Sequence, residues 1–172
     1  MPARPSLYPQ VGLTVTHETD GCVFGHYRNM LICAWCETPA LANLHACYDV
    51  AKNLARTHRK FSAMHILLNP QWLPDKAQRE VIVSGLRDFA TQQISFGALI
   101  VGSGYSPNAI RIYFRSLQGP EHTGTKIVLA STIPELVSNV LPRHIRVSGV
   151  ELVGRHLETA CQQAIERLQP NN

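Results

Sequence analysis

The chain alternates between short apolar runs and longer segments in which apolar residues recur every three or four positions. Short runs bounded by turn residues predict strands, and the longer period predicts amphipathic helices. The strands are predicted at Val11–His17, Cys22–His26, Met30–Trp35, Phe61–Leu68, Phe96–Val101 and Lys126–Ala130.

The residues at the borders of these segments indicate where the elements begin and end. An Asp-Gly pair at 20–21 predicts a hairpin between the first two strands. Capping residues and prolines predict helix starts at Thr38–Pro39, Pro74–Asp75, Ser106–Pro107, Thr132–Glu135 and Ser148–Glu151. Pro142 is expected to end the fourth helix, and the fifth helix is expected to continue to Leu168.

The resulting order of elements is typical of an α/β fold. Strands that alternate with helices predict a mostly parallel sheet of about five to six strands, with an N-terminal antiparallel hairpin and helices packed on it. We expect an irregular N-terminal arm at 1–10, the α/β domain at 11–142 and a helical extension at 143–172. The C-terminal helix has two interpretations: it covers the sheet, or it protrudes and pairs with a second subunit.

The composition supports one folded domain and excludes other classes of protein. The chain has 172 residues, of which 45% are hydrophobic and 16% are charged. Its apolar runs are far shorter than the roughly 20 residues of a membrane span, so no membrane contact is expected. A net charge of +4 is weak for a nucleic-acid-binding protein. Five cysteines and no signal peptide predict reduced thiols and a cytoplasmic location.

Two phrases of the sequence resemble a known family. One is the run Met30–Trp35 followed by Thr38–Pro39, and the other is Ala98–Tyr105 followed by Arg111. Over about residues 12–141 the chain is similar to STAS-like domains related to bacterial anti-sigma-factor antagonists, and to small myxobacterial proteins. The resemblance implies a non-enzymatic module for signal transduction, with protein partners and self-association as a homodimer. The loop 69–75 lacks Ser and Thr, so it does not carry the phosphorylated residue of such antagonists.

A glycine-containing turn supplies an alternative function. The segment 102–108 joins the end of a strand to the start of a helix, where α/β proteins bind ligands and where backbone N–H groups attract anions. A tight turn with a helix cap explains the same residues without a ligand. If a small molecule or an anion binds there, the residues that bind it are Ser103, Gly104, Tyr105, Ser106 and Arg111.

The cysteines supply a further alternative. Cys33 and Cys36 have the Cys-x-x-Cys spacing of redox disulfides and of half a zinc site. A mixed metal site with Cys22, His26 or Cys47 requires that the fold bring them together, and the cysteines are otherwise structural. His65 lies in an apolar strand and is expected to be a core or interface histidine.

The loop 69–75 also offers a candidate surface for a protein partner. Trp72, with Leu73 beside it, is flanked by prolines and either contacts a partner or folds back on the core. We find no catalytic constellation and no cofactor motif, which favours a non-enzymatic function.

Overall fold

The computed structural model describes residues 12–71, 73–118 and 125–169, and the expected arm at 1–10 lies outside this part. The order of the elements follows the sequence-based prediction. The bounds of the elements are β1 (Thr14–Thr19), β2 (Cys22–Tyr27), β3 (Met30–Trp35), α1 (Leu41–Thr57), β4 (Phe61–Leu67), α2 (Lys76–Asp88), β5 (Gln93–Ile100), α3 (Tyr105–Ser116), β6 (Lys126–Ala130), α4 (Ile133–Ser148) and α5 (Gly154–Leu168).

The six strands form one sheet in which spatial order equals sequence order, β1 to β6. The pairs β1–β2 and β2–β3 are antiparallel, whereas β3 to β6 pair in parallel. Thr19 faces Cys22 across the first hairpin, so residues 20–21 form the two-residue turn that the sequence predicts. The predicted α/β class, with an antiparallel start and a parallel remainder, is confirmed.

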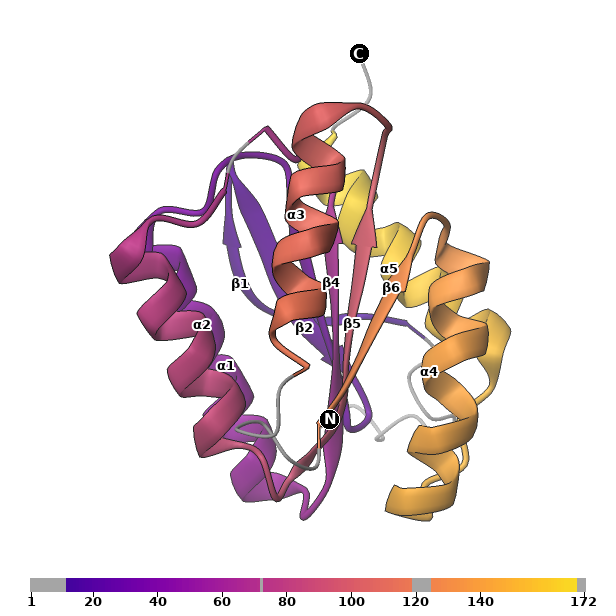
Figure 1. The fold of residues 1–172 in the computed structure, drawn as a ribbon. Helices are drawn as coiled ribbons and strands as arrows, with labels where there is room; N and C mark the ends of the chain where they lie inside the picture. The colour runs from indigo at the N-terminus through magenta and orange to yellow at the C-terminus, as the bar shows by residue number, and fades with distance from the viewer. Residues whose placement is uncertain (1–11, 72, 119–124, 170–172) are drawn as a thin grey trace, which may run out of the picture.

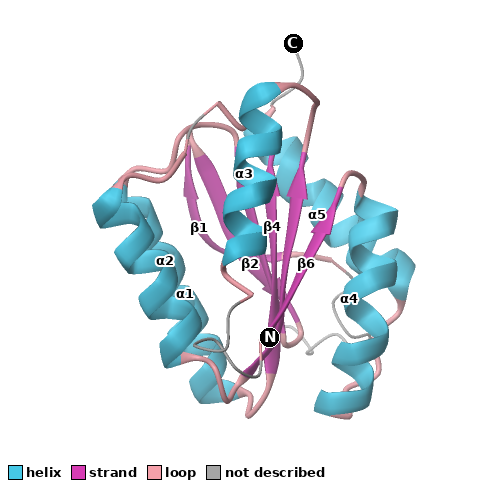
Figure 2. Cartoon of the chain, in the orientation of Figure 1, coloured by secondary structure: helices cyan, strands magenta, loops and turns pink. Residues whose placement is uncertain are grey.

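The helices cover both faces of the sheet (Figures 1 and 2). Each parallel connection steps to the next strand in the same direction, and right-handed crossovers therefore place α1, α2 and α3 on one face. Helices α4 and α5 pack on the other face, where they share a core with β2 to β6. The C-terminal helix thus covers β2 and β3, which answers the question left open by the sequence.

Three helices begin later or earlier than the sequence predicts. Helix α5 begins at Gly154 with Val153 as its N-cap, not at Ser148–Glu151, because Ser148 is the last residue of α4. Helix α1 begins at Leu41 with Ala40 as its N-cap, not at Thr38–Pro39. Helix α3 begins at Tyr105 with Gly104 as its N-cap, so the expected cap Ser106 lies inside the first turn. Gly104 has a φ of 105°, a conformation that favours glycine, and this explains why the chain turns into the helix before the serine.

The prediction that a helix ends at Pro142 is wrong. Helix α4 passes through Pro142 and ends at Ser148, where Gly149 takes the left-handed conformation of a C-cap. The expected domain border at 142/143 therefore falls inside this helix. Buried residues on both sides of the proline, including Val140 and His144, hold the helix against the sheet. This packing outweighs the proline penalty of roughly 3 kcal/mol.

A glycine allows α4 to approach the sheet closely. A Cβ atom at Gly97 of β5 would lie 2.7 Å from Leu136 Cδ1 and 3.1 Å from Val140 Cγ2. Both side chains are buried, so they have little room to move. The face that α4 and α5 cover is therefore a tightly packed interior.

A buried polar network anchors the second half of α4 to the start of β4. His144 is fully buried, with its Nδ1 atom 2.9 Å from Ser62 Oγ and its Nε2 atom 3.0 Å from Asn29 Oδ1. Because Asn29 donates its Nδ2–H to the carbonyl of Lys60, its Oδ1 accepts from His144 Nε2–H. Burial lowers the pKa of His144 to about 4, so the ring is neutral at neutral pH.

We predict that this histidine makes the protein sensitive to mild acid. The unfolded chain binds a proton at an ordinary histidine pKa near 6.5, but the folded protein does so only near pH 4, where the pKa of His144 lies. The stability that His144 contributes is therefore fully present above about pH 6.5. As the pH falls from 6.5 to 4, the free energy of unfolding drops by about 3 kcal/mol, because only the unfolded chain binds the proton in this range. Urea unfolding of wild type and His144→Gln at several pH values measures this contribution. Parallel curves of stability against pH for the two proteins would contradict it.

Candidate functional site

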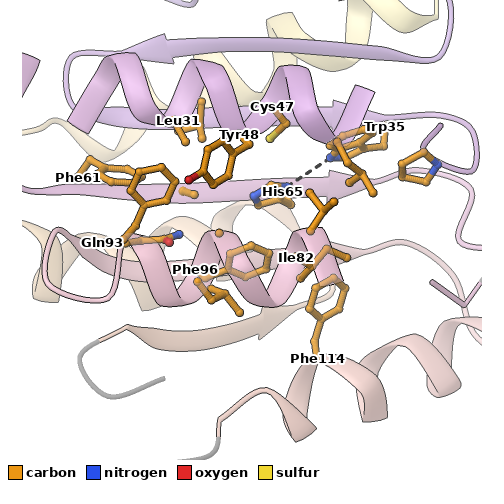
Figure 3. A pocket seen from close by; sticks show the side chains of 18 of the residues that line it. Leu31, Trp35, Cys47, Tyr48, Phe61, His65, Ile82, Gln93, Phe96 and Phe114 are labelled. Carbon is orange, nitrogen blue, oxygen red and sulfur yellow. Dashed lines mark hydrogen bonds between the residues drawn. The ribbon is translucent and has the colours of Figure 1, made fainter. Parts of the chain in front are cut away.

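A mostly apolar cavity of about 90 Å³ lies between the sheet and the layer formed by α1, α2 and α3 (Figure 3). Strands β3, β4 and β5 form its floor, with Leu31, Ala63 and Phe96 among the lining residues. Helix α2 contributes Val81 and Ile82, which are only partly buried. Because α2 packs mainly on α1, its apolar face is not pressed onto the strands, and the space remains beneath it.

Small residues keep this space open. Ala63 occupies the floor between larger neighbours, and Gly85 of α2 lies on the opposite wall. A Cβ atom at Gly85 would lie 3.5 Å from the ring of Tyr48, which is an ordinary contact. A methyl group therefore fits at this position.

Gln93 places an unpartnered amide on the cavity wall. The residue is only 5% exposed, and within the described part of the chain its amide has no hydrogen-bond partner. The amide points into the space between Phe61 and Phe96 (Figure 3). By contrast, the hydroxyl of Tyr48 is satisfied, because it donates to Asp88 Oδ2 at 2.6 Å.

His65 places a second polar group in the same cavity. Trp35 Nε1–H donates to His65 Nδ1 at 3.3 Å, and the imidazole ring stacks on Phe96 with ring centroids 4.4 Å apart. Burial lowers the pKa of His65 to about 4, so the ring is neutral. Since Nδ1 accepts a hydrogen bond, the proton lies on Nε2, for which the described residues supply no acceptor.

The thiols of Cys33 and Cys47 meet beside this histidine. Their sulfur atoms are 3.5 Å apart, and both lie within 4.8 Å of a ring nitrogen of His65. Cys33 and His65 face each other across β3 and β4, and Cys47 reaches them from α1. Burial is the main cause that raises the pKa of the Cys33 thiol well above its usual value, and the contact with Cys47 raises it further.

The Cys-x-x-Cys pair is separated by this arrangement. Cys36 donates its thiol proton to the carbonyl of Asp20 at 3.2 Å, away from the sulfur–sulfur contact. Burial and the nearby carboxylate of Glu37 raise the pKa of Cys36, which is the opposite of an activated redox thiol. Of the partners considered for a mixed site, the fold brings Cys47 to Cys33 and adds His65, which the sequence indicated only as a core or interface residue.

The glycine-containing turn lies where the sequence predicts, between β5 and α3, and the guanidinium of Arg111 is already engaged in hydrogen bonds. Arg111 donates to the carbonyl oxygens of Ile100 and Gly102 at 2.8 and 2.9 Å, and to Asn108 Oδ1 at 3.0 Å. The guanidinium therefore holds the end of the strand to the helix. Ser103, Gly104 and Tyr105 are exposed and Ser106 is partly exposed. Anion binding at this turn stays a prediction.

The candidate partner surface after β4 is described only in part. Leu73 is 54% exposed, and Trp72 lies outside the described residues. Among the helices of the described ranges, none has both the length and the apolar composition that crossing a bilayer requires.

Comparison with known proteins gives no relative from which to transfer a function. No protein-family model, curated protein or solved structure matches the chain significantly. The function must therefore be argued from the cavity and its side chains.

We predict that Gly85→Ala stabilises the protein. Alanine is favoured over glycine in a helix interior by about 1 kcal/mol, and the added methyl group finds an ordinary contact with Tyr48. Urea unfolding measures the gain. The exposed neighbour Ser84→Ala is the matched control, for which helix propensity alone gives less than about 0.7 kcal/mol. A loss of stability in Gly85→Ala would show that α2 cannot accept a side chain at this position.

Proposed function

We propose that the protein binds a small, largely apolar molecule that carries one hydrogen-bonding group, in the cavity beneath α2. The observation that carries this proposal is the amide of Gln93, which faces a mostly apolar cavity and has no hydrogen-bond partner in the described part of the chain. Polar groups in largely buried positions normally find a partner. A ligand in the cavity supplies one.

The rest of the cavity defines the shape and polarity of this ligand. Aromatic side chains, including Phe61, Phe89 and Phe96, favour a flat apolar body. Gln93 offers both a donor and an acceptor, and His65 offers the Nε2–H donor. Among the described residues that line the space, none carries a charge, so a neutral ligand is favoured over an ionised one.

Phenol and toluene form a matched pair of probes for this proposal. They have nearly the same shape, and only phenol carries a hydroxyl group. We expect phenol to bind about 10-fold more tightly than toluene, because a satisfied buried hydrogen bond contributes about 1 kcal/mol or more. Titrations followed by two-dimensional NMR give both affinities, and the shifted resonances show whether the probes bind beneath α2.

Two variants identify the cause of the preference. Gln93→Leu keeps the apolar volume and removes the amide, so it should bind both probes with similar affinity. Ala63→Leu fills the floor of the cavity and should weaken binding of both. A preference for phenol that survives Gln93→Leu, or shifts confined to other surfaces, would overturn the proposal.

A second candidate function rests on α3. Tyr105 and Ile112 are 88% and 65% exposed, and their spacing of seven residues places them on one side of the helix. Exposed aromatic and aliphatic side chains in one stripe favour a contact with another protein. We propose that this stripe serves the self-association implied by the resemblance to STAS-like domains.

For this surface we expect a dimer that depends on the apolar stripe. Sedimentation velocity of wild type at tens of micromolar should show the dimer, and the double variant Tyr105→Ser, Ile112→Ser should sediment as a monomer. Lys52→Ser, an exposed change on α1, is the control and should leave the dimer intact. A monomeric wild type, or a dimer in the double variant, would reject α3 as the contact surface.

A further inference from the structure

Three side chains that can ligate a metal ion meet beside the cavity. Within the described ranges, Cys33, Cys47 and His65 are the group of His, Cys, Asp and Glu side chains close enough to hold one metal ion. Two sulfur atoms and one imidazole nitrogen form a soft ligand set of the kind that selects zinc. Three different elements supply them: β3, α1 and β4.

We propose that Cys33, Cys47 and His65 bind one zinc ion as a three-ligand site. The inference goes beyond the proposed function, because it rests on the sulfur–nitrogen cluster and not on the unpartnered amide of Gln93.

The distances within the cluster are close to those of a zinc centre. Zinc–sulfur bonds of about 2.3 Å in tetrahedral geometry place two sulfur ligands about 3.8 Å apart. Cys33 Sγ and Cys47 Sγ are already 3.5 Å apart. The histidine nitrogen lies within 4.8 Å of both, so it needs to approach by no more than about 1 Å to complete the ligand set.

The charge balance of the site fits its apolar surroundings. Zinc binding converts two thiols to thiolates, and the two protons pass to solvent. One Zn²⁺, two thiolates and one neutral imidazole then sum to zero charge. A neutral assembly avoids the large cost of placing a net charge among buried apolar side chains such as Leu31 and Phe61.

The fourth position of the zinc ion would open toward the cavity. Cys47 and His65 line the cavity, so an ion held between them lies at its wall. Three protein ligands leave one position for water or for a small ligand, as in zinc sites that bind substrates. In the metal-free ring, Nδ1 of His65 accepts the hydrogen bond from Trp35 and Nε2 carries the proton. Zinc bound through Nδ1 would therefore replace the Trp35 hydrogen bond, and zinc bound through Nε2 would replace the proton.

Cobalt titration tests this site in the full chain. The protein is first treated with a chelator and a thiol reductant, and Co²⁺ is then added under argon. We expect one Co²⁺ per chain, with thiolate-to-cobalt charge-transfer absorption and the visible bands of a four-coordinate ion. One equivalent of Zn²⁺ should abolish both. In a Trp72→Phe background the remaining tryptophan, Trp35, should change its fluorescence in step with the absorption.

Single substitutions assign the ligands. Removing a residue that only hydrogen-bonds to a metal ligand typically weakens metal binding by about 10–100-fold. Removing a ligand itself should cost more, so Cys33→Ala, Cys47→Ala and His65→Gln should each weaken Co²⁺ binding by at least about 100-fold. Cys36→Ala is the matched control, because the Cys36 thiol contacts Asp20 and not the cluster. Its affinity for Co²⁺ should stay within about 3-fold of the wild-type affinity, a far smaller change than loss of a ligand causes. Near-ultraviolet circular dichroism shows whether each variant is folded.

Several results would overturn the zinc site. Wild type without thiolate–cobalt absorption would reject it, and this result does not depend on any variant. Binding that survives Cys33→Ala and Cys47→Ala, or that is lost in Cys36→Ala, would place the metal elsewhere. A thiol count that finds Cys33 and Cys47 joined as a disulfide in the reduced preparation would also reject it. Failure of phenol binding would leave these results unchanged, since Gln93 is not a ligand.

Discussion

The strand order is the constraint on which the rest of the structure depends. Each parallel strand follows its predecessor by one step of about 4.8 Å, and right-handed crossovers place all three connecting helices on one face. A helix with its side chains is about 10 Å wide, so three helices do not fit side by side over three such steps. Helix α1 covers the antiparallel end, α3 covers the β5–β6 end, and α2 packs against α1. The cavity over the centre of the sheet follows from this crowding.

The two faces of the sheet consequently differ in how closely their helices pack on the strands. Beneath α4, glycine at position 97 brings helix and strand into close contact, and His144 satisfies two buried polar groups. Beneath α2, an amide and an imidazole N–H lack partners among the described residues, and apolar helix residues are only partly buried. The proposed ligand would pair with these two groups on the second face.

Local patterns predicted the elements well, because the signals for strands and turns are local. The bounds of β3 and β6 agree with their apolar runs, and the Asp-Gly turn lies between the paired ends of β1 and β2. Helix ends were harder to predict. Pro142 carries a strong local signal for termination, and the packing of α4 against the sheet overrides it. Gly104 precedes Ser106 as the N-cap, because a positive φ starts the helix earlier.

The candidate site was only partly predictable, because it depends on register and helix phase. Cys33 was found from its spacing to Cys36, but residues three apart on a strand point to opposite faces, which separates such a pair. Cys33 of β3 is paired with His65 of β4, and the register between these two strands is set by the packing of the whole sheet, not by the local sequence. Cys47 joins them only because α1 turns that side of its surface toward β3. Parallel pairing and helix packing thus bring the three proposed zinc ligands together from residues that are ordinary core residues in the sequence.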